Sequence, residues 1–132
     1  MSADTFTVRV YYEDTDFSGN VYYAAYLHFF ERARTEFLRA RGVHHTELLN
    51  DGVAFAVRKL QIEYLAAAHI DDALEVATEL VQLTAARLDL RQTISRDGVE
   101  LTRAEVQLVA IKMQGGVTRF PVLVRTALTS DP

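Results

Sequence analysis

Two kinds of hydrophobic spacing divide this chain of 132 residues. From Val21 to Arg41, apolar residues recur every three or four positions, as they do along one face of an α-helix. After Gly52, apolar and polar residues alternate with a period of two, which is typical of β-strands. The pattern therefore predicts one long helix followed by a half of the chain that forms a sheet.

The predicted helix begins at Val21 and ends before Gly42, since glycine readily adopts the backbone conformation that terminates helices. At 1.5 Å per residue it would be roughly 30 Å long. Its first half, from Tyr22 to Phe30, is apolar nearly all round, and a helix of that kind is enclosed on several sides. We therefore expect the sheet to wrap around this helix.

Five strands are expected, one before the helix and four after it. Turn-forming dipeptides at Asp71-Asp72, Asp97-Gly98 and Gly115-Gly116 separate the later strands, and short turns join antiparallel neighbours. The strands run from Phe6 to Tyr12, Val53 to Leu65, Ala73 to Leu83, Leu88 to Ser95 and Leu101 to Met113. The expected class is α+β, with one antiparallel sheet around one central helix in a single domain of residues 1–132.

Two of these strands carry irregularities. Between Val53 and Leu65 the apolar phase switches near Arg58-Lys59, which predicts a β-bulge there. In the last strand the outward face is polar as far as Gln107 and apolar beyond it. That mixed face suggests a sheet edge or a contact between copies of the chain.

Composition narrows the function classes. A hydrophobic content of 49% and a charged content of 24% indicate a globular protein. The net charge of −4 argues against nucleic acid as a partner. Without cysteine there is no disulfide, no Cys-ligated zinc and no thiol nucleophile. The N-terminus shows no secretion signal and no apolar run is long enough for a transmembrane segment, so we expect a cytoplasmic protein.

The densest group of reactive side chains lies between Glu13 and Asn20, just ahead of the predicted helix. Asp14, Asp16, Ser18 or Asn20 could serve only as a helix cap, a role that these residue types often fill. A phosphatase-like pair formed by Asp14 and Asp16 would need a parallel doubly wound sheet, which this strand pattern does not offer. No Gly-x-Ser-x-Gly motif is present to suggest a serine triad.

The segment from Arg9 to Leu27, RVYYEDTDFSGNVYYAAYL, closely resembles the 4-hydroxybenzoyl-CoA thioesterase family of hotdog folds. Within that family it is most similar to the Tol/Pal-associated acyl-CoA thioesterase branch. The resemblance continues through residues 31–36, residues 53–59 and Asp71-Asp72, and so spans nearly the whole chain. It implies a hotdog fold, in agreement with the order of strand, helix and sheet deduced above.

The resemblance also implies a set of site residues. Asp16 is the implied catalytic carboxylate, and the backbone N–H of Tyr23 is implied to polarise the thioester carbonyl. The expected substrate-binding residues are Gly19, Val21, Tyr22, Val57, Arg58 and Lys59. Asp16 could attack the carbonyl directly or activate water, and the sequence leaves both routes open. Tyr23 and Ala25 depart from the branch, which usually has His and Asn at these positions.

Other conspicuous residues have simpler interpretations. His44-His45 is expected in a solvated loop, because no second group of metal ligands accompanies it. His28 is expected to be packed, and the charged residues Glu31, Arg32 and Arg34 to form ion pairs or a dimer contact. Arg58, Lys59 and Arg87 are candidates for contacts with CoA phosphates, although exposed basic residues are common.

We therefore expect an acyl-CoA thioesterase that needs no metal or cofactor and that could also accept an acyl group on acyl carrier protein. One alternative is a thioesterase for aromatic substrates such as hydroxybenzoyl-CoA or dihydroxynaphthoyl-CoA. Another is a module that binds acyl thioesters without hydrolysing them. The partly apolar outer face and the resemblance imply a homodimer or homotetramer with a site built between subunits.

Overall fold

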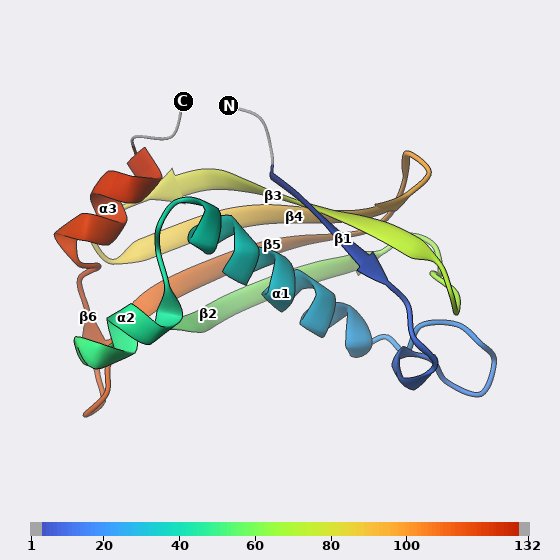
Figure 1. Cartoon of the computed structure of the whole chain (residues 1–132), viewed down its shortest axis with the longest axis horizontal. Helices are drawn as coiled ribbons and strands as arrows, with labels where there is room; N and C mark the ends of the chain where they lie inside the picture. The colour runs from blue at the N-terminus through green and yellow to red at the C-terminus, as the bar shows by residue number, and fades with distance from the viewer. Residues whose placement is uncertain (1–3, 130–132) are drawn as a thin grey trace.

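The computed structural model describes residues 4–129, which form one antiparallel sheet with helices packed on it (Figure 1). In chain order the elements are β1 (Asp4–Arg9), the 3-10 helix η1 (Tyr12–Asp14), α1 (Ala25–Ala40), α2 (His45–Asn50), β2 (Val53–Tyr64), β3 (Ala73–Leu83), β4 (Arg87–Arg96), β5 (Val99–Lys112), β6 (Val117–Thr118) and α3 (Val122–Thr129). Figure 1 shows α1 lying across one face of this sheet. The expected hotdog-like α+β architecture is confirmed.

The strand order is β1-β3-β4-β5-β2, and β6 adds a short pairing to β5. The last long strand, β5, therefore lies inside the sheet, and the prediction that it forms an edge is wrong. Its polar outer residues are explained by pairing across strands, since Glu105 bonds to Arg91 and Arg103 lies 3.8 Å from Glu63. The open edges belong to β1 and β2.

The bulge predicted in β2 is confirmed. The register between β2 and β5 shifts between Val57 and Lys59, so that Val57 pairs with Leu108 and Leu60 with Val106. Leu108 and Val106 lie two residues apart on β5 and therefore point to the same side of the sheet. The extra residue in β2 thus keeps Val57 and Leu60 on the side that faces α1. The switch of hydrophobic phase in the sequence thus has a simple structural cause.

Helix α1 begins at Ala25, four residues later than expected. Val21 does not start the helix because it is held in an extended antiparallel bridge with Thr15, and its N–H donates to the carbonyl of Ala68 at 2.8 Å. Tyr22, Tyr23 and His28 are exposed, so the first part of the predicted helix is not enclosed. The expected stop at Gly42 is confirmed, with φ of +80°.

Three shorter elements also differ from expectation. The first strand ends at Arg9, because the carboxylate of Asp14 accepts the N–H of Tyr11 and turns the chain into η1. Helix α2 includes His45, whose ring packs edge-on against Phe55 with centroids 5.7 Å apart, so the predicted solvated loop at this residue is wrong. Helix α3 follows Pro121 and buries Val124 and Leu128.

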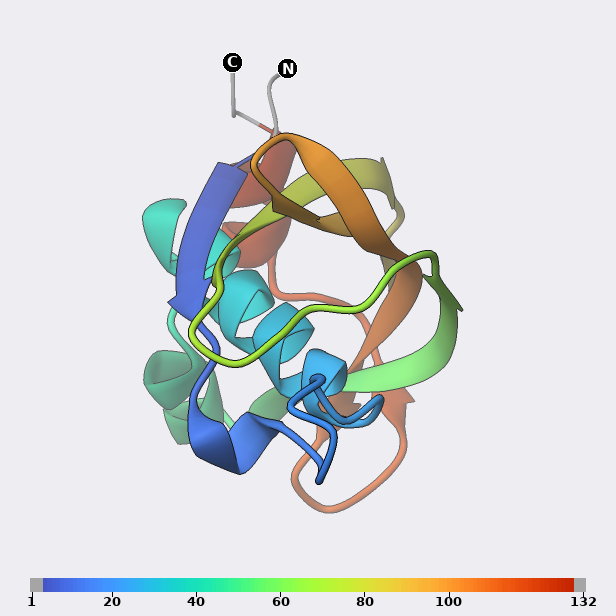
Figure 2. The ribbon, with the colours of Figure 1, turned by 90° about the vertical axis from the view of Figure 1, so that its right-hand side faces the viewer.

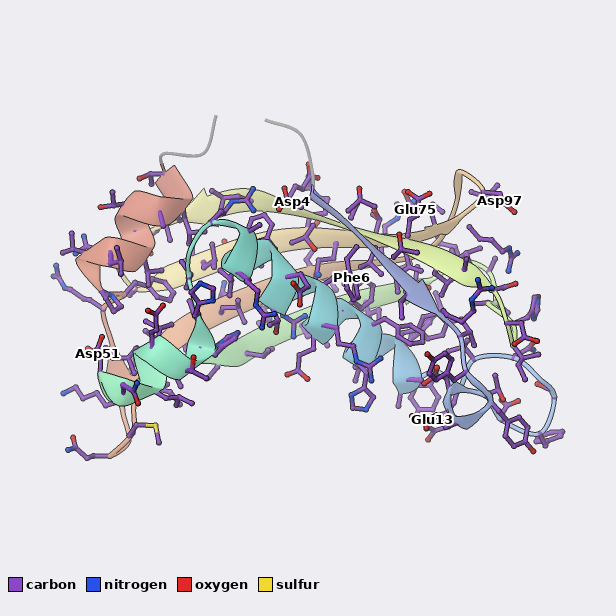
Figure 3. All side chains as sticks on the ribbon, viewed as in Figure 1. Asp4, Phe6, Glu13, Asp51, Glu75 and Asp97 are labelled. Atoms are coloured by element: carbon purple, nitrogen blue, oxygen red, sulfur yellow. The ribbon has the colours of Figure 1, made fainter. Side chains whose placement is uncertain are left out.

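The core lies between α1 and the sheet. Fully buried rings of α1 meet apolar side chains of β3 and β4; these are Phe29, Phe30, Phe37, Leu74, Leu88, Leu90 and Ile94. Figure 3 shows side chains filling this space, whereas the labelled Asp51, Glu75 and Asp97 are exposed. Arg34 enters this layer and donates to the buried Gln92 at 3.0 Å, a hydrogen bond that the sequence did not predict. This layer fixes the position of α1 against the sheet.

Candidate active site

The loop between η1 and α1 folds back on itself. The N–H of Asp16 donates to the carbonyl of Asn20 at 3.0 Å, and the N–H of Gly19 donates to the carbonyl of Asp16 at 3.1 Å. Gly19 has a φ of +82°, in the left-handed region that favours glycine. The fold-back brings Asp16 toward the start of α1, although Ala25 comes nine residues later in the sequence.

A second segment, residues 65–72 between β2 and β3, holds this loop in place. The N–H of Val21 donates to the carbonyl of Ala68, and the N–H of Ile70 donates to the carbonyl of Gly19. The Asn20 and His69 side chains are 2.7 Å apart in a further hydrogen bond. Figure 2 shows the two segments side by side at one end of the molecule.

Asp72 anchors the second segment in turn. Its carboxylate accepts the N–H of His69 at 2.8 Å and pairs with the Arg96 guanidinium at 2.6 Å. Burial alone would raise the pKa of Asp72, but the hydrogen bond from His69 and the pairing with Arg96 outweigh burial and lower it. Asp72 is therefore a charged, structural carboxylate that lies away from the hollow described below.

The carboxylate of Asp16 has two unlike oxygens. Its Oδ1 accepts both the hydroxyl of Ser18 at 2.5 Å and the backbone N–H of Ser18 at 2.8 Å. These two bonds, the hydroxyl first, lower the pKa of Asp16, so the group is ionised at neutral pH. Within residues 4–129, Oδ2 has no hydrogen-bond partner. One oxygen thus fixes the side chain and the other is free.

The helix-capping interpretation of this cluster does not hold. The N-cap residue of α1 is Ala24, and no side chain caps it. Asp14 supports η1 and Asp16 bonds to Ser18. Because α1 begins at Ala25 and not at Val21, four more residues than expected separate Asp16 from the helix.

The turn before α1 leaves two backbone donors unpaired. The N–H of Tyr22 donates to Asp14, and the N–H of Ala25 donates to the carbonyl of Tyr22 at 2.8 Å. Between them, the N–H groups of Tyr23 and Ala24 find no acceptor in the part of the chain that the structure describes. Unpaired N–H groups at the start of a helix are suited to bind a developing negative charge.

Asp16 and this turn share one hollow of about 490 Å³. Its lining residues are Asp16, Asn20, Val21, Tyr22, Tyr23, Tyr26, Tyr64, Leu65, Ala66 and Ala67. Sequence reasoning missed Tyr26 and Tyr64, because a tyrosine in a helical or alternating pattern looks like any core residue. The Tyr64 ring meets the rings of Tyr23 and Tyr26, with centroids 6.5 and 5.4 Å apart.

The other expected substrate-binding residues lie elsewhere in the single chain. Gly19 forms the turn beside the hollow without lining it. Val57 lines a different hollow, of about 430 Å³, between α1 and β2, and Lys59 lies on the outer face of the sheet. Arg58 is exposed and reaches Gln107 at 3.4 Å.

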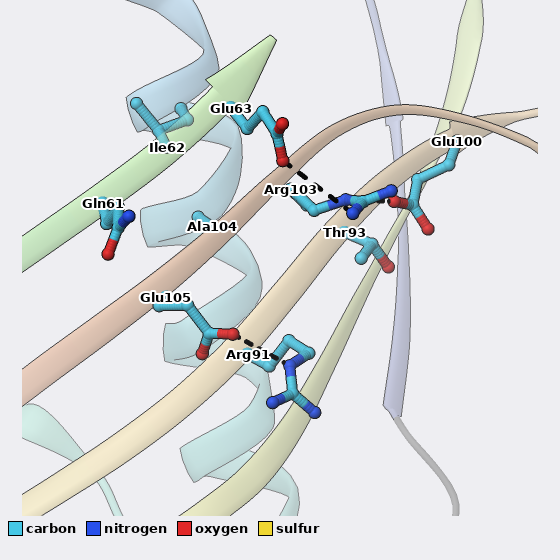
Figure 4. A pocket seen from close by; sticks show the side chains of 9 residues that line it. All are labelled: Gln61, Ile62, Glu63, Arg91, Thr93, Glu100, Arg103, Ala104 and Glu105. Carbon is cyan, nitrogen blue, oxygen red and sulfur yellow. Dashed lines mark hydrogen bonds and ion pairs between the residues drawn. The ribbon is translucent and has the colours of Figure 1, made fainter. Parts of the chain in front are cut away.

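A hollow of about 680 Å³ lies on the outer face of the sheet (Figure 4). Arg91 bonds to Glu105 at 3.0 Å, and Arg103 bonds to Glu100 at 2.6 Å. Because these charges already pair with one another, the hollow offers no free carboxylate beside unpaired donors. We therefore place the candidate site at Asp16.

The described part of the chain has neither a cluster of metal ligands nor a helix that could span a membrane. Residues 4–129 contain no group of three or more His, Asp or Glu side chains that could hold a metal ion. No helix within the same range is long and apolar enough to cross a membrane.

Comparison with known proteins shows the family to which the chain belongs. The sequence profile of the thioesterase-like superfamily matches residues 10–128. The chain belongs to this superfamily. It is 44% identical over 110 residues to the acyl-CoA thioesterase YbgC of Haemophilus influenzae, covering 83% of this chain and 81% of that protein.

Solved structures of thioesterases have the same fold. A probable thioesterase from Bartonella henselae superposes with a TM-score of 0.86 at 40% identity, over 91% of this chain and all (100%) of that one. Slr0204 of Synechocystis, a 1,4-dihydroxy-2-naphthoyl-CoA thioesterase, superposes with a TM-score of 0.89 at 26% identity, over 98% and 99% of the two chains. The family resemblance stated from the sequence is confirmed.

Proposed function

We propose that this protein hydrolyses acyl-CoA thioesters to the free acid and CoA. The observation that carries the proposal is that one hollow is lined both by Asp16, whose Oδ2 is free, and by Tyr23, whose backbone N–H is unpaired. A carboxylate and oxyanion donors are the two components that acyl transfer from a thioester requires. The Haemophilus influenzae relative, an acyl-CoA thioesterase by name, supports the same substrate class.

The thioester carbonyl would point its oxygen at the N–H of Tyr23. As the carbonyl carbon becomes tetrahedral, its oxygen gains negative charge, and one well-placed donor stabilises that charge by about 3 to 4 kcal/mol. Val21 and Tyr22 would form the walls beside the acyl group. The side chain of Tyr23 replaces a histidine of the related branch, but the backbone donor does not depend on the side chain.

Two reaction routes are open to Asp16. As a nucleophile, Oδ2 forms a bond to the carbonyl carbon, the C–S bond breaks, CoA leaves as a thiolate that takes a proton from water, and water then hydrolyses the mixed anhydride. As a general base, Asp16 takes a proton from a water molecule that attacks the carbonyl carbon, and the C–S bond breaks in the same way. The geometry is compatible with either route.

We further propose that the site is completed by a second copy of the chain. The free edge of β2 exposes Val57 and Leu60, and Tyr64 at the end of this strand lines the hollow. A two-fold pairing of β2 with another β2 would be antiparallel, because symmetry reverses the strand direction. If the two-fold axis passed near Gln61, this pairing would bring the segment from Val57 to Lys59 of one subunit close to Tyr64 of the other, where these residues could contact substrate.

An aromatic acyl-CoA is the second candidate substrate. Four tyrosine rings, Tyr22, Tyr23, Tyr26 and Tyr64, surround the hollow, and the rings of Tyr22 and Tyr23 are only 4.9 Å apart at their centroids. Aromatic side chains favour flat aromatic ligands through edge and face contacts. A purely binding module is less favoured, because such a module has no need of a free carboxylate beside the carbonyl.

A panel of thioesters tests the proposed function. Straight-chain acyl-CoAs of increasing length, benzoyl-type CoAs and an acyl group on acyl carrier protein are each mixed with the protein, and thiol release is followed. We expect sustained hydrolysis within at least one CoA series, without added metal or cofactor. Binding of acyl-CoA by calorimetry without any thiol release would instead show a non-catalytic module.

A further inference from the structure

Tyr64, the last residue of β2, contacts the turn that leads into α1. Its hydroxyl donates a hydrogen bond to the carbonyl of Tyr23 at 2.8 Å. Within residues 4–129 this is the only hydrogen bond from a side chain to the backbone of residues 22–24. Since Ala24 provides no side-chain cap, this bond adds a side-chain contact to the backbone bonds that hold the turn.

Two consecutive peptide units in the turn are arranged alike. The carbonyl of Tyr22 accepts the N–H of Ala25, while the N–H of the same peptide unit, that of Tyr23, is free. The carbonyl of Tyr23 accepts the Tyr64 hydroxyl, while the N–H of that peptide unit, that of Ala24, is free. Each unit is therefore bonded at its oxygen and open at its nitrogen.

A hydrogen bond at a peptide oxygen affects the N–H across the same unit. The peptide group is planar, so fixing the C=O direction also fixes the N–H direction. Bonding at the oxygen further polarises the group and strengthens its N–H as a donor. Ala24 has helical angles, φ −76° and ψ −18°, so its peptide group is aligned with the start of α1.

We propose that Tyr64 is a positioning residue for thioester hydrolysis, and that its hydroxyl orients the peptide between Tyr23 and Ala24 so that the N–H of Ala24 acts as a second oxyanion donor. This inference rests on the proposed function and extends it from one donor to two. Tyr64 acts through the backbone and need not touch the substrate.

The chemistry of Tyr64 fits this role. Burial is the main cause that raises its pKa above that of an ordinary tyrosine, so the hydroxyl stays protonated and can donate at any neutral or mildly alkaline pH. Its ring is held between Tyr23 and Tyr26, which limits the directions the hydroxyl can take. A tyrosine that only filled space would need no hydroxyl.

The substitution Tyr64→Phe tests the inference, because it removes the hydroxyl and keeps the ring contacts. We expect kcat for the best acyl-CoA of the panel to fall at least about 10-fold with KM within about twofold, since an oxyanion donor acts mainly in the transition state. Tyr12→Phe is the matched control, since Tyr12 is 81% exposed and lies outside the hollow. A kcat for Tyr64→Phe within twofold of the wild type, or a loss confined to KM, would overturn the inference.

Infrared spectroscopy gives a second readout that does not depend on turnover. In the Asp16→Asn background a bound acyl-CoA labelled with ¹³C at its carbonyl should persist, and its C=O stretch reports polarisation by the donors. Adding Tyr64→Phe should move this band toward its frequency in solution, and an unmoved band would count against a role for Tyr64. Full activity in Asp16→Asn alone would instead refute the proposed catalytic role of Asp16, so the two failures are distinguishable.

Discussion

At the scale of single residues, the main feature is that the two oxygens of Asp16 differ in their hydrogen bonding. Oδ1 is fixed by two bonds from Ser18, Oδ2 is free, and Asp16 lines the hollow. Fixing one oxygen reduces the conformational freedom that a reacting carboxylate would otherwise lose. Ser18 thus has a supporting role that its position in the sequence motif alone does not reveal.

The substitution Ser18→Ala should move the acid limb of the pH–rate profile. The Ser18 hydroxyl is the largest cause of the lowered pKa of Asp16, so its loss raises that pKa toward the ordinary value near 4. The ionised form then disappears at a higher pH, and kcat/KM falls earlier on acidification while the rate at pH 7 hardly changes. The profile is measured from about pH 3 to pH 7. Thr129→Ala serves as the control, because it removes a hydroxyl that donates to the carbonyl of Arg125 in α3. An acid limb of the pH–rate profile that does not move in Ser18→Ala would refute this explanation.

Variants of Tyr23 separate the backbone donor from the side chain. Tyr23→Phe and Tyr23→Ala keep the N–H, whereas Tyr23→Pro removes it. Proline suits the position, because the bond from Ala25 to Tyr22 closes a four-residue turn in which Tyr23 is second. We expect Tyr23→Phe to keep most activity, and turnover in Tyr23→Pro to be about 100-fold below that in Tyr23→Ala. Equal turnover in the last two would exclude the N–H of Tyr23 as a donor.

At the scale of elements, the site depends on two loops that pair with each other. Residues 15–24 and residues 65–72 exchange backbone bonds, and the Tyr26 hydroxyl accepts the N–H of Ala68 at 3.0 Å. Neither loop belongs to a regular strand or helix. The ion pair of Asp72 and Arg96 links this assembly to β4.

The substitution Asp72→Asn should destabilise the fold at neutral pH. Asparagine can still accept the N–H of His69 but loses the pairing with Arg96, at a cost of about 1 kcal/mol in unfolding free energy. Because folding lowers the pKa of Asp72, the stabilisation is present above about pH 4 and is lost as the pH falls through the lower folded value. Denaturation curves of the two proteins should therefore converge in acid.

The control for this experiment is Glu63→Gln, which breaks the solvent-exposed contact with Arg103 at 3.8 Å. Exposed ion pairs contribute little, so this variant should unfold almost like the wild type. Equal stability of Asp72→Asn and wild type at pH 7 would contradict the anchoring role of Asp72.

Periodicity predicted the elements that bury a long apolar face and missed the rest. The bulge at Arg58 left a visible change of phase, and Gly42 marked a helix end. The start of α1 could not be predicted, because Val21 is kept extended by its bridge to Thr15 and its bond to Ala68, a contact between distant parts of the sequence. Helices α2 and α3 are too short for periodicity to establish. Asp16 could be proposed from its sequence motif, whereas the hydrogen bond from Tyr64 to the turn before α1 is visible only in the fold.

At the scale of the whole molecule, β2 is an edge strand of the sheet with exposed apolar side chains. An edge strand with exposed apolar residues such as Val57 and Leu60 invites pairing with another chain. Light scattering coupled to size exclusion should therefore show at least a dimer, and Leu60→Lys should shift it toward monomer and reduce turnover. A wild-type monomer of 14.9 kDa at micromolar concentration would contradict the proposed assembly.

The central claim, that the Asp16 carboxylate carries out thioester hydrolysis, is tested most directly by turnover of Asp16→Asn. Asparagine keeps the oxygen that Ser18 bonds but loses the charge and the basicity, so kcat should fall at least about 100-fold while the melting temperature hardly moves. Asp14→Asn is the matched control, because its oxygen can still accept the N–H of Tyr11. Near wild-type turnover in Asp16→Asn, or a larger loss in Asp14→Asn, would contradict the claim.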